Sequence, residues 1–225
     1  MLREKTVRPP PQFDSGLRLG KDEKRSVPED QAMRDGDCEG GLLKAQDTAV
    51  ELYQLAALML GNESEALSLV ESTVAQLEVD PCAEEEAAIE VARHHLIEGA
   101  VARMNQADPQ GFVAPVASDG PVVGCIEEDD LAAAGFSSSQ MAELIGGAGR
   151  GELRAWLDKL PLAQRAIFVQ RAVLGWDNGA TAASLDIGAG AGSAWSAQQV
   201  GELFRQALCS LANSLVHSEA HKATM

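Results

Sequence analysis

Apolar residues recur at helical spacing through residues 42–106, and this pattern constrains the fold more than any other feature of the chain. The repeat is interrupted at Gly61 and again at Pro81, two residues that commonly end helices. It therefore predicts three helices, over residues 42–60, 63–79 and 83–106. Three helices of this length joined by short turns predict a compact bundle.

A second helical region follows a stretch of proline, glycine and acidic residues. Its pattern predicts four further helices, over residues 152–160, 161–174, 179–186 and 196–216. Two helix starts carry a capping signal, in which a short polar residue is followed three positions on by Glu or Gln. These pairs are Asn62 with Glu65 and Ser196 with Gln199.

The composition favours the same fold class, because alanine and leucine dominate while aromatic residues make up only 4% of the chain. We predict an all-α protein with two small helical domains, a three-helix bundle and a helix-turn-helix-like domain, joined by a flexible linker. The predicted boundaries are a disordered arm at 1–40, the bundle at 41–106, the linker at 107–150, the second domain at 151–218 and a tail at 219–225. A short helix is expected inside the linker, over residues 137–145.

The formal net charge of −16 is unevenly distributed. Residues 41–106 hold 3 Lys/Arg against 12 Asp/Glu, whereas residues 151–218 hold 5 of each. Proteins that bind DNA unaided normally show a basic face, because neutralising phosphates releases counterions and supplies most non-specific affinity. Neither region has such a surplus, so we expect this protein to bind DNA weakly when it is alone.

The four cysteines are far apart, with no CxxC pair and no histidine at ligand spacing. This spacing predicts free thiols in a reducing cytosol and no metal site. We expect a cytoplasmic protein without a membrane span, because no apolar run approaches the length that crosses a bilayer. No nucleophile and base lie together in the sequence, so we expect neither an enzyme nor a cofactor or small-molecule substrate.

Four segments in order are similar to motifs of one protein family. They are ELYQLAALMLGNESEALSLVESTVAQL (51–77), VARHHLI (91–97), LPLAQRAIFV (160–169) and QQVGELFRQALCSL (198–211). Together they resemble the extracytoplasmic-function sigma factors, small bacterial transcription initiation factors with two helical domains on a flexible linker. The resemblance covers residues 42–106 and 152–216.

The resemblance implies partners and contact residues. Core RNA polymerase, or an anti-sigma regulator, would bind the bundle through Leu69, Val70, Thr73 and Leu77. Promoter DNA would be contacted by Arg165, Gln199 and Arg205 in the helix-turn-helix-like domain. The residues alone leave two interpretations of Arg165 and Arg171: they reach phosphates, or they lie on a solvated helix face.

The sequence departs from the family where the chemistry lies. Ser68 and Glu71 stand where the clamp helix typically carries an acid and a glutamine, and Gly201, Glu202 and Leu203 stand where basic or polar residues are expected. The glycine-rich run at 188–195 also lengthens the turn before the last helix. Three functions stay open: a divergent sigma factor, which we place first, a sigma mimic that binds an anti-sigma regulator without DNA, and a helical scaffold.

Overall fold

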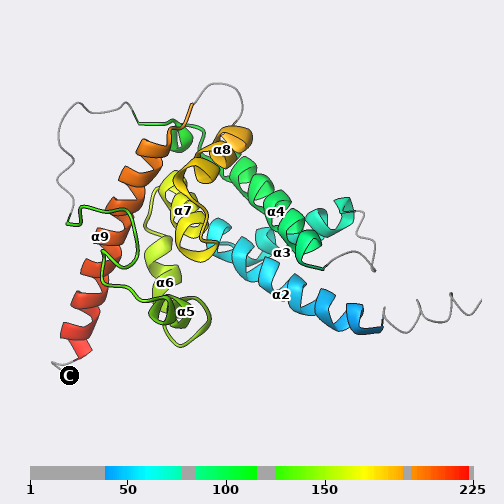
Figure 1. Ribbon diagram of the computed structural model, residues 1–225, viewed down its shortest axis with the longest axis horizontal. Coiled ribbons are helices and arrows are strands. Elements are labelled where there is room, and N and C mark those ends of the chain that lie inside the picture. Colours follow the sequence, from blue (N-terminus) through cyan, green and yellow to red (C-terminus); the bar gives the residue numbers. More distant parts are fainter. Residues whose placement is uncertain (1–38, 78–84, 116–124, 190–193, 223–225) are drawn as a thin grey trace, which may run out of the picture. The chain divides into compact units, whose positions relative to one another are not determined.

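The computed structural model describes residues 39–77, 85–115, 125–189 and 194–222. All regular elements within these ranges are helical, which confirms the predicted all-α class (Figure 1). The helices are α2 (Glu39–Leu60), α3 (Glu63–Gln76), α4 (Glu85–Ala107), α5 (Ser138–Gly146), α6 (Arg150–Leu157), α7 (Leu162–Phe168), α8 (Asn178–Ala189) and α9 (Ala197–Lys222), with a 3-10 turn η1 (Gln110–Phe112) and a π-helical turn η2 (Val169–Val173). The predicted arm at 1–40 lies almost wholly outside the described residues, as does the middle of the glycine-rich run.

Helix starts and ends follow local sequence signals. The Asn62 side chain accepts from the backbone N–H groups of Ser64 and Glu65, so it caps α3 as predicted. Ser196 and Gln199 form the predicted capping box at the start of α9, each side chain accepting from the other's backbone N–H. Gly61, at a φ of 71°, follows the last residue of α2 in the left-handed conformation that glycine adopts most easily.

The buried core draws on both predicted domains. Helices α2, α3 and α4 pack on one another, and α4 also packs along α8 (Figure 1). At this second contact, the ring of His94 stacks on Trp176 with 4.6 Å between centroids. Arg154 of α6 pairs with Glu63 of α3 at 3.1 Å. Helices from both halves contribute to this one core, so the predicted division into two domains is not confirmed. Independent folding of the two halves stays a prediction.

Some boundaries differ from the expected ones. The predicted continuous helix over 161–174 changes at Val169 into the π-helical turn η2, where Leu174 N–H donates to the Val169 carbonyl. The last helix, α9, continues to Lys222, beyond the predicted end at 216. The part of the predicted linker that the structure describes contains η1, the short α5 and the start of α6.

Within the described ranges, none of the helices combines the length and the hydropathy required to cross a membrane.

Candidate nucleic-acid interface

The helices expected to contact DNA pack on an apolar core. Phe168 and Phe204 are fully buried between α7 and α9, with ring centroids 6.1 Å apart. The Trp156 ring meets Phe168 edge to face at 4.8 Å. On α9, Val200, Ala207 and Leu208 continue the buried face at helical spacing. The opposite face of α9 is therefore left to carry polar side chains.

Two arginines and an asparagine meet beside this core, and we call Arg171, Asn178 and Arg205 the arginine cluster. Arg171 comes from η2, Asn178 from the first turn of α8 and Arg205 from α9. The Arg171 guanidinium lies over the Phe204 ring at 4.9 Å and donates from Nη1 to the Trp176 carbonyl at 2.7 Å. These two contacts hold the Arg171 side chain through Phe204 and Trp176.

An acidic stretch of the chain covers the arginine cluster, and we call residues 125–131 the acidic segment. Arg205 Nη1 donates to the Glu127 carbonyl at 2.9 Å, and Arg171 Nη2 donates to the Asp129 carbonyl at 2.8 Å. The Asp129 carboxylate accepts a hydrogen bond from Asn178 and lies 3.7 Å from Arg171 Nη2. The cluster's donors therefore point at oxygens of the protein's own chain.

The electrostatics of Asp129 reflect this position. The hydrogen bond from Asn178 is the largest cause that lowers the pKa of the Asp129 carboxyl, and the charges of Arg171 and Arg205 act in the same direction against the opposing effect of burial. The carboxylate thus stays ionised in a partly buried position. It acts as an anionic ligand of the cluster.

Gly201 makes room for that carboxylate. A Cβ atom at position 201 of α9 would lie 2.7 Å from Asp129 Oδ2 and 3.0 Å from Asn178 Nδ2. In the sequence, Gly201 stands where the recognition helix of the similar family is expected to carry a basic or polar residue. In the structure the Asp129 carboxylate lies against this position, so a side chain at residue 201 would force the carboxylate to shift.

A disulfide fastens the acidic segment to α9, and it corrects the expectation of free thiols. Cys125 and Cys209 are bonded, with Cα atoms 5.7 Å apart and a sequence separation of 84. The Cys125 N–H also donates to Cys209 Sγ at 3.1 Å. The prediction was wrong because it considered only neighbouring cysteines, and spacing along the chain cannot reveal so distant a pair. Cys38 and Cys82 lie outside the described residues.

The three residues expected to contact DNA are all engaged within the chain. Arg165 is buried, with its side chain 6% exposed, and pairs with Asp158 at 3.0 Å while donating to the Leu157 carbonyl. Burial lowers the pKa of its guanidinium. Gln199 caps α9 and donates to the Pro115 carbonyl at 2.6 Å. Arg205 belongs to the arginine cluster. It lies on α9 and shares the acidic segment with a second arginine, Arg171.

Arg165 has a structural role that the sequence does not predict. Its guanidinium lies against the turn between α2 and α3, where a Cβ on Gly61 would meet Arg165 Nη1 at 2.6 Å. It therefore joins that turn to α6 and α7. A phosphate contact by Arg165 would require this residue to leave a buried ion pair.

The residues expected to bind polymerase lie on the buried side of α3. Leu69, Val70 and Thr73 are buried, and Leu77 is half-buried against the core. Leu69 meets α4 at Gly99, where an added Cβ would lie 2.8 Å from Leu69 Cδ1. In this conformation they pack the bundle, and their role in partner binding stays a prediction.

A side of α3 next to the buried stripe is open, and we call Leu67, Glu71 and Val74 the α3 face. These residues are spaced i, i+4 and i+7, so they share one side of the helix. Leu67 and Val74 are 52% and 50% exposed, among the large apolar side chains that the described residues leave in solvent. The periodicity of α3 contains this signal, since Leu67 and Val74 are out of phase with the buried stripe.

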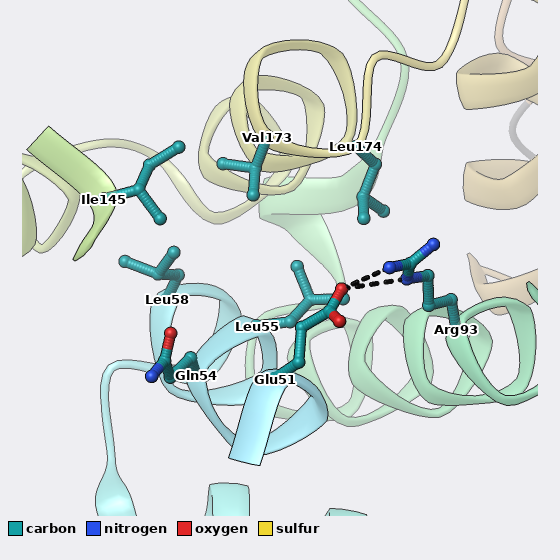
Figure 2. A pocket seen from close by; sticks show the side chains of 8 residues that line it. All are labelled: Glu51, Gln54, Leu55, Leu58, Arg93, Ile145, Val173 and Leu174. Carbon is teal, nitrogen blue, oxygen red and sulfur yellow. Dashed lines mark hydrogen bonds and ion pairs between the residues drawn. The ribbon is translucent and has the colours of Figure 1, made fainter. Parts of the chain in front are cut away.

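A pocket of about 170 Å³ lies between α2, α4, α5 and η2 (Figure 2). Leu58, Ile145 and Val173 give it apolar walls, and Glu51 pairs with Arg93 at its edge. Figure 2 shows this ion pair across from Leu174, with no nucleophile among the lining residues.

The chain matches no protein-family model, no curated protein and no solved structure.

Proposed function

We propose that this chain is a divergent sigma-like transcription factor, similar to the extracytoplasmic-function sigma factors, that binds core RNA polymerase through α3. Polymerase would supply most of the affinity for promoter DNA, and the α7–α9 region would bias the choice of promoter. We propose no catalytic step and no cofactor for the chain.

The exposed α3 face is the observation that carries this proposal. Single exposed apolar residues are common on protein surfaces, but Leu67 and Val74 lie two turns apart on one side of a helix, with Glu71 between them. A helix that presents apolar anchors around a charged residue fits the surface of a partner helix. The resemblance assigns polymerase binding to this same helix, although to its now buried side.

A second candidate, the sigma mimic, is favoured by a different observation. Arg165, Gln199 and Arg205 all have partners within the chain. A protein in this state would dock on a polymerase or an anti-sigma regulator through α3 without contacting DNA. Both candidate functions use the α3 face. The partner that binds to it, core RNA polymerase or an anti-sigma regulator, therefore decides between them.

Three valines of nearly equal exposure make a matched test of the α3 face. Val74 on α3, Val50 on α2 and Val91 on α4 are 50%, 50% and 49% exposed. Each Val→Asp change adds the same charge to a helix surface and leaves the intrinsic helix propensity nearly unchanged. We expect Val74→Asp to weaken binding to purified core RNA polymerase by about tenfold or more, which corresponds to a hot spot of 1.4 kcal/mol. Val50→Asp and Val91→Asp should leave it within about twofold.

The measurement is the dissociation constant from sedimentation or gel filtration of the labelled chain with core enzyme. Glu71→Lys should weaken the same complex without loss of helicity by circular dichroism. Equal binding by all three valine variants would place the interface elsewhere. Failure of the wild-type chain to bind core enzyme, with recovery of a small regulator from the native cell, would replace the sigma-like function with mimicry.

A further inference from the structure

The arginine cluster has more donor capacity than its own chain uses. Among the described residues, no acceptor reaches the buried Nε atoms of Arg171 and Arg205. The acidic segment meets these guanidinium groups with two backbone carbonyls and one carboxylate. An arginine binds a phosphate most strongly through a parallel pair of N–H groups, one of which is commonly Nε.

One member of the cluster is also held in place without the acidic segment. The Phe204 ring and the Trp176 carbonyl fix Arg171, whereas Arg205 and Asn178 project toward the segment from helices packed on the core. Loss of the segment would therefore leave Arg171 already positioned and free the donors of Arg205 and Asn178 beside it. Pre-positioned donors lose little entropy when they bind an anion.

We infer that Arg171, Asn178 and Arg205 form a binding site for the phosphate backbone of nucleic acid, that the acidic segment occupies this site, and that the Cys125–Cys209 disulfide holds it closed. The inference rests on the proposed function, because it names promoter DNA as the ligand of the α7–α9 region. The segment takes the place of a phosphodiester, with Asp129 supplying the negative charge. Glu127, Glu128 and Asp130 would add repulsion toward approaching DNA.

The position of the disulfide explains how it closes the site. Cys209 lies four residues after Arg205, so both share one side of α9. A covalent link at this point shortens the tether between Asp129 and α9 to four residues, which raises the segment's effective concentration at the cluster. Without the link, the segment is held on the cluster by three hydrogen bonds and one ion pair, and Ile126 and Leu131 pack against the core.

Opening the site requires a dithiol reductant. One thiolate of the reductant attacks a sulfur of the disulfide, which releases one cysteine thiolate and forms a mixed disulfide. The second thiolate of the reductant then attacks the reductant's own sulfur in the mixed disulfide and releases the other cysteine thiolate. Two electrons and two protons pass to Cys125 and Cys209, and the reductant leaves as its own disulfide. Cys125 is exposed, so a reductant can reach it.

The test compares oxidised wild type, wild type reduced with dithiothreitol, and Cys125→Ser. Amide hydrogen exchange over residues 125–131 reports release of the segment, and anisotropy of a labelled DNA duplex reports binding. We expect faster exchange and tighter DNA binding in both open forms. Two added phosphate contacts steepen the salt dependence by about 1.8 in log–log slope, so raising the salt fourfold should weaken the open forms about tenfold more than the oxidised protein.

Arginine variants identify the site. In the Cys125→Ser background, Arg171→Gln with Arg205→Gln should remove the gain in affinity and return the salt slope to that of the oxidised protein. Arg103→Gln is the matched control, because Arg103 lies on α4 and donates to the Glu65 carbonyl. It should retain the gain.

Three results would overturn the inference. The first is unchanged amide exchange over residues 125–131 on reduction. The second is faster exchange with no gain in DNA affinity, and the third is a gain in DNA affinity that survives replacement of both arginines. The outcome is separable from that of the proposed function, because none of these measurements contains polymerase. A chain that binds DNA on reduction but never binds core enzyme would support the inference and overturn the proposed function. A chain that binds core enzyme but gains no DNA binding on reduction would support the proposed function and overturn the inference.

Discussion

Replacing Gly61 with alanine tests whether Arg165 joins the α2–α3 turn to α6 and α7. Gly61 has a φ of 71°, and an added Cβ would lie 2.6 Å from Arg165 Nη1 and 2.8 Å from Asp158 Oδ1. Both distances are shorter than Cβ contacts allow, so the ion pair must move. The change therefore perturbs this junction without altering any charge.

The expected cost has two parts. Placing alanine in the left-handed region costs about 1–2 kcal/mol. Displacing Arg165 from Asp158 and from the Leu157 carbonyl removes hydrogen bonds made by a charged group, worth about 1.5–3 kcal/mol. We expect the free energy of unfolding to fall by about 3–4 kcal/mol, which lowers Tm by roughly 10 °C in a chain of this size.

Gly175 supplies the matched control. Its φ is 69°, and no atom lies within 4 Å of its added Cβ, so Gly175→Ala bears the conformational cost alone. Thermal and urea unfolding followed by circular dichroism would measure both variants. Equal losses for Gly61→Ala and Gly175→Ala would refute the role given to Arg165.

Three further predictions follow from the charges and the chain organisation. If two helical domains fold independently, protease should cut within residues 107–136 and leave two resistant fragments, whereas one resistant core spanning residues 42–216 would contradict independent domains. Glu202→Lys should raise DNA affinity in the Cys125→Ser background and steepen its salt dependence by about one to two phosphate contacts, and an unchanged titration would mean that this side of α9 does not face DNA. Because the pKa of Asp129 is lowered from its ordinary value of 3.8, its contribution to stability is complete above that pH and is lost as the pH falls through the lower folded value. Urea unfolding of wild type against Asp129→Asn from pH 6 to pH 3 should show the wild type losing this advantage at the acid end, and parallel curves would contradict it.

Helices and caps could be predicted from the sequence because their causes are local. Asn62 and Ser196 cap helices through atoms two or three residues away, and the stop at Gly61 depends on its own φ. The π-helical turn at Val169–Val173 is the exception, since its sequence reads as continuous helix. Such turns are rare and occur mostly as single turns inside α-helices.

The candidate site could not be predicted in the same way. Arg171 meets Asp129 across 42 residues and Arg205 meets Glu127 across 78. No periodicity links positions so far apart. From the sequence, Arg171 is equally consistent with a solvated surface cation. Gly201 is interpreted as a lost DNA-contact position, because the sequence does not show that the Asp129 carboxylate lies beside it.

The most direct test of the proposed function is transcription from fragmented genomic DNA by core RNA polymerase, with and without the reduced chain. Sequencing the 5′ ends of the transcripts locates every start site. A sigma-like factor predicts discrete starts that depend on the chain and share an upstream sequence. Binding of the chain to core enzyme with no chain-dependent starts would contradict initiation and leave the sigma mimic as the function.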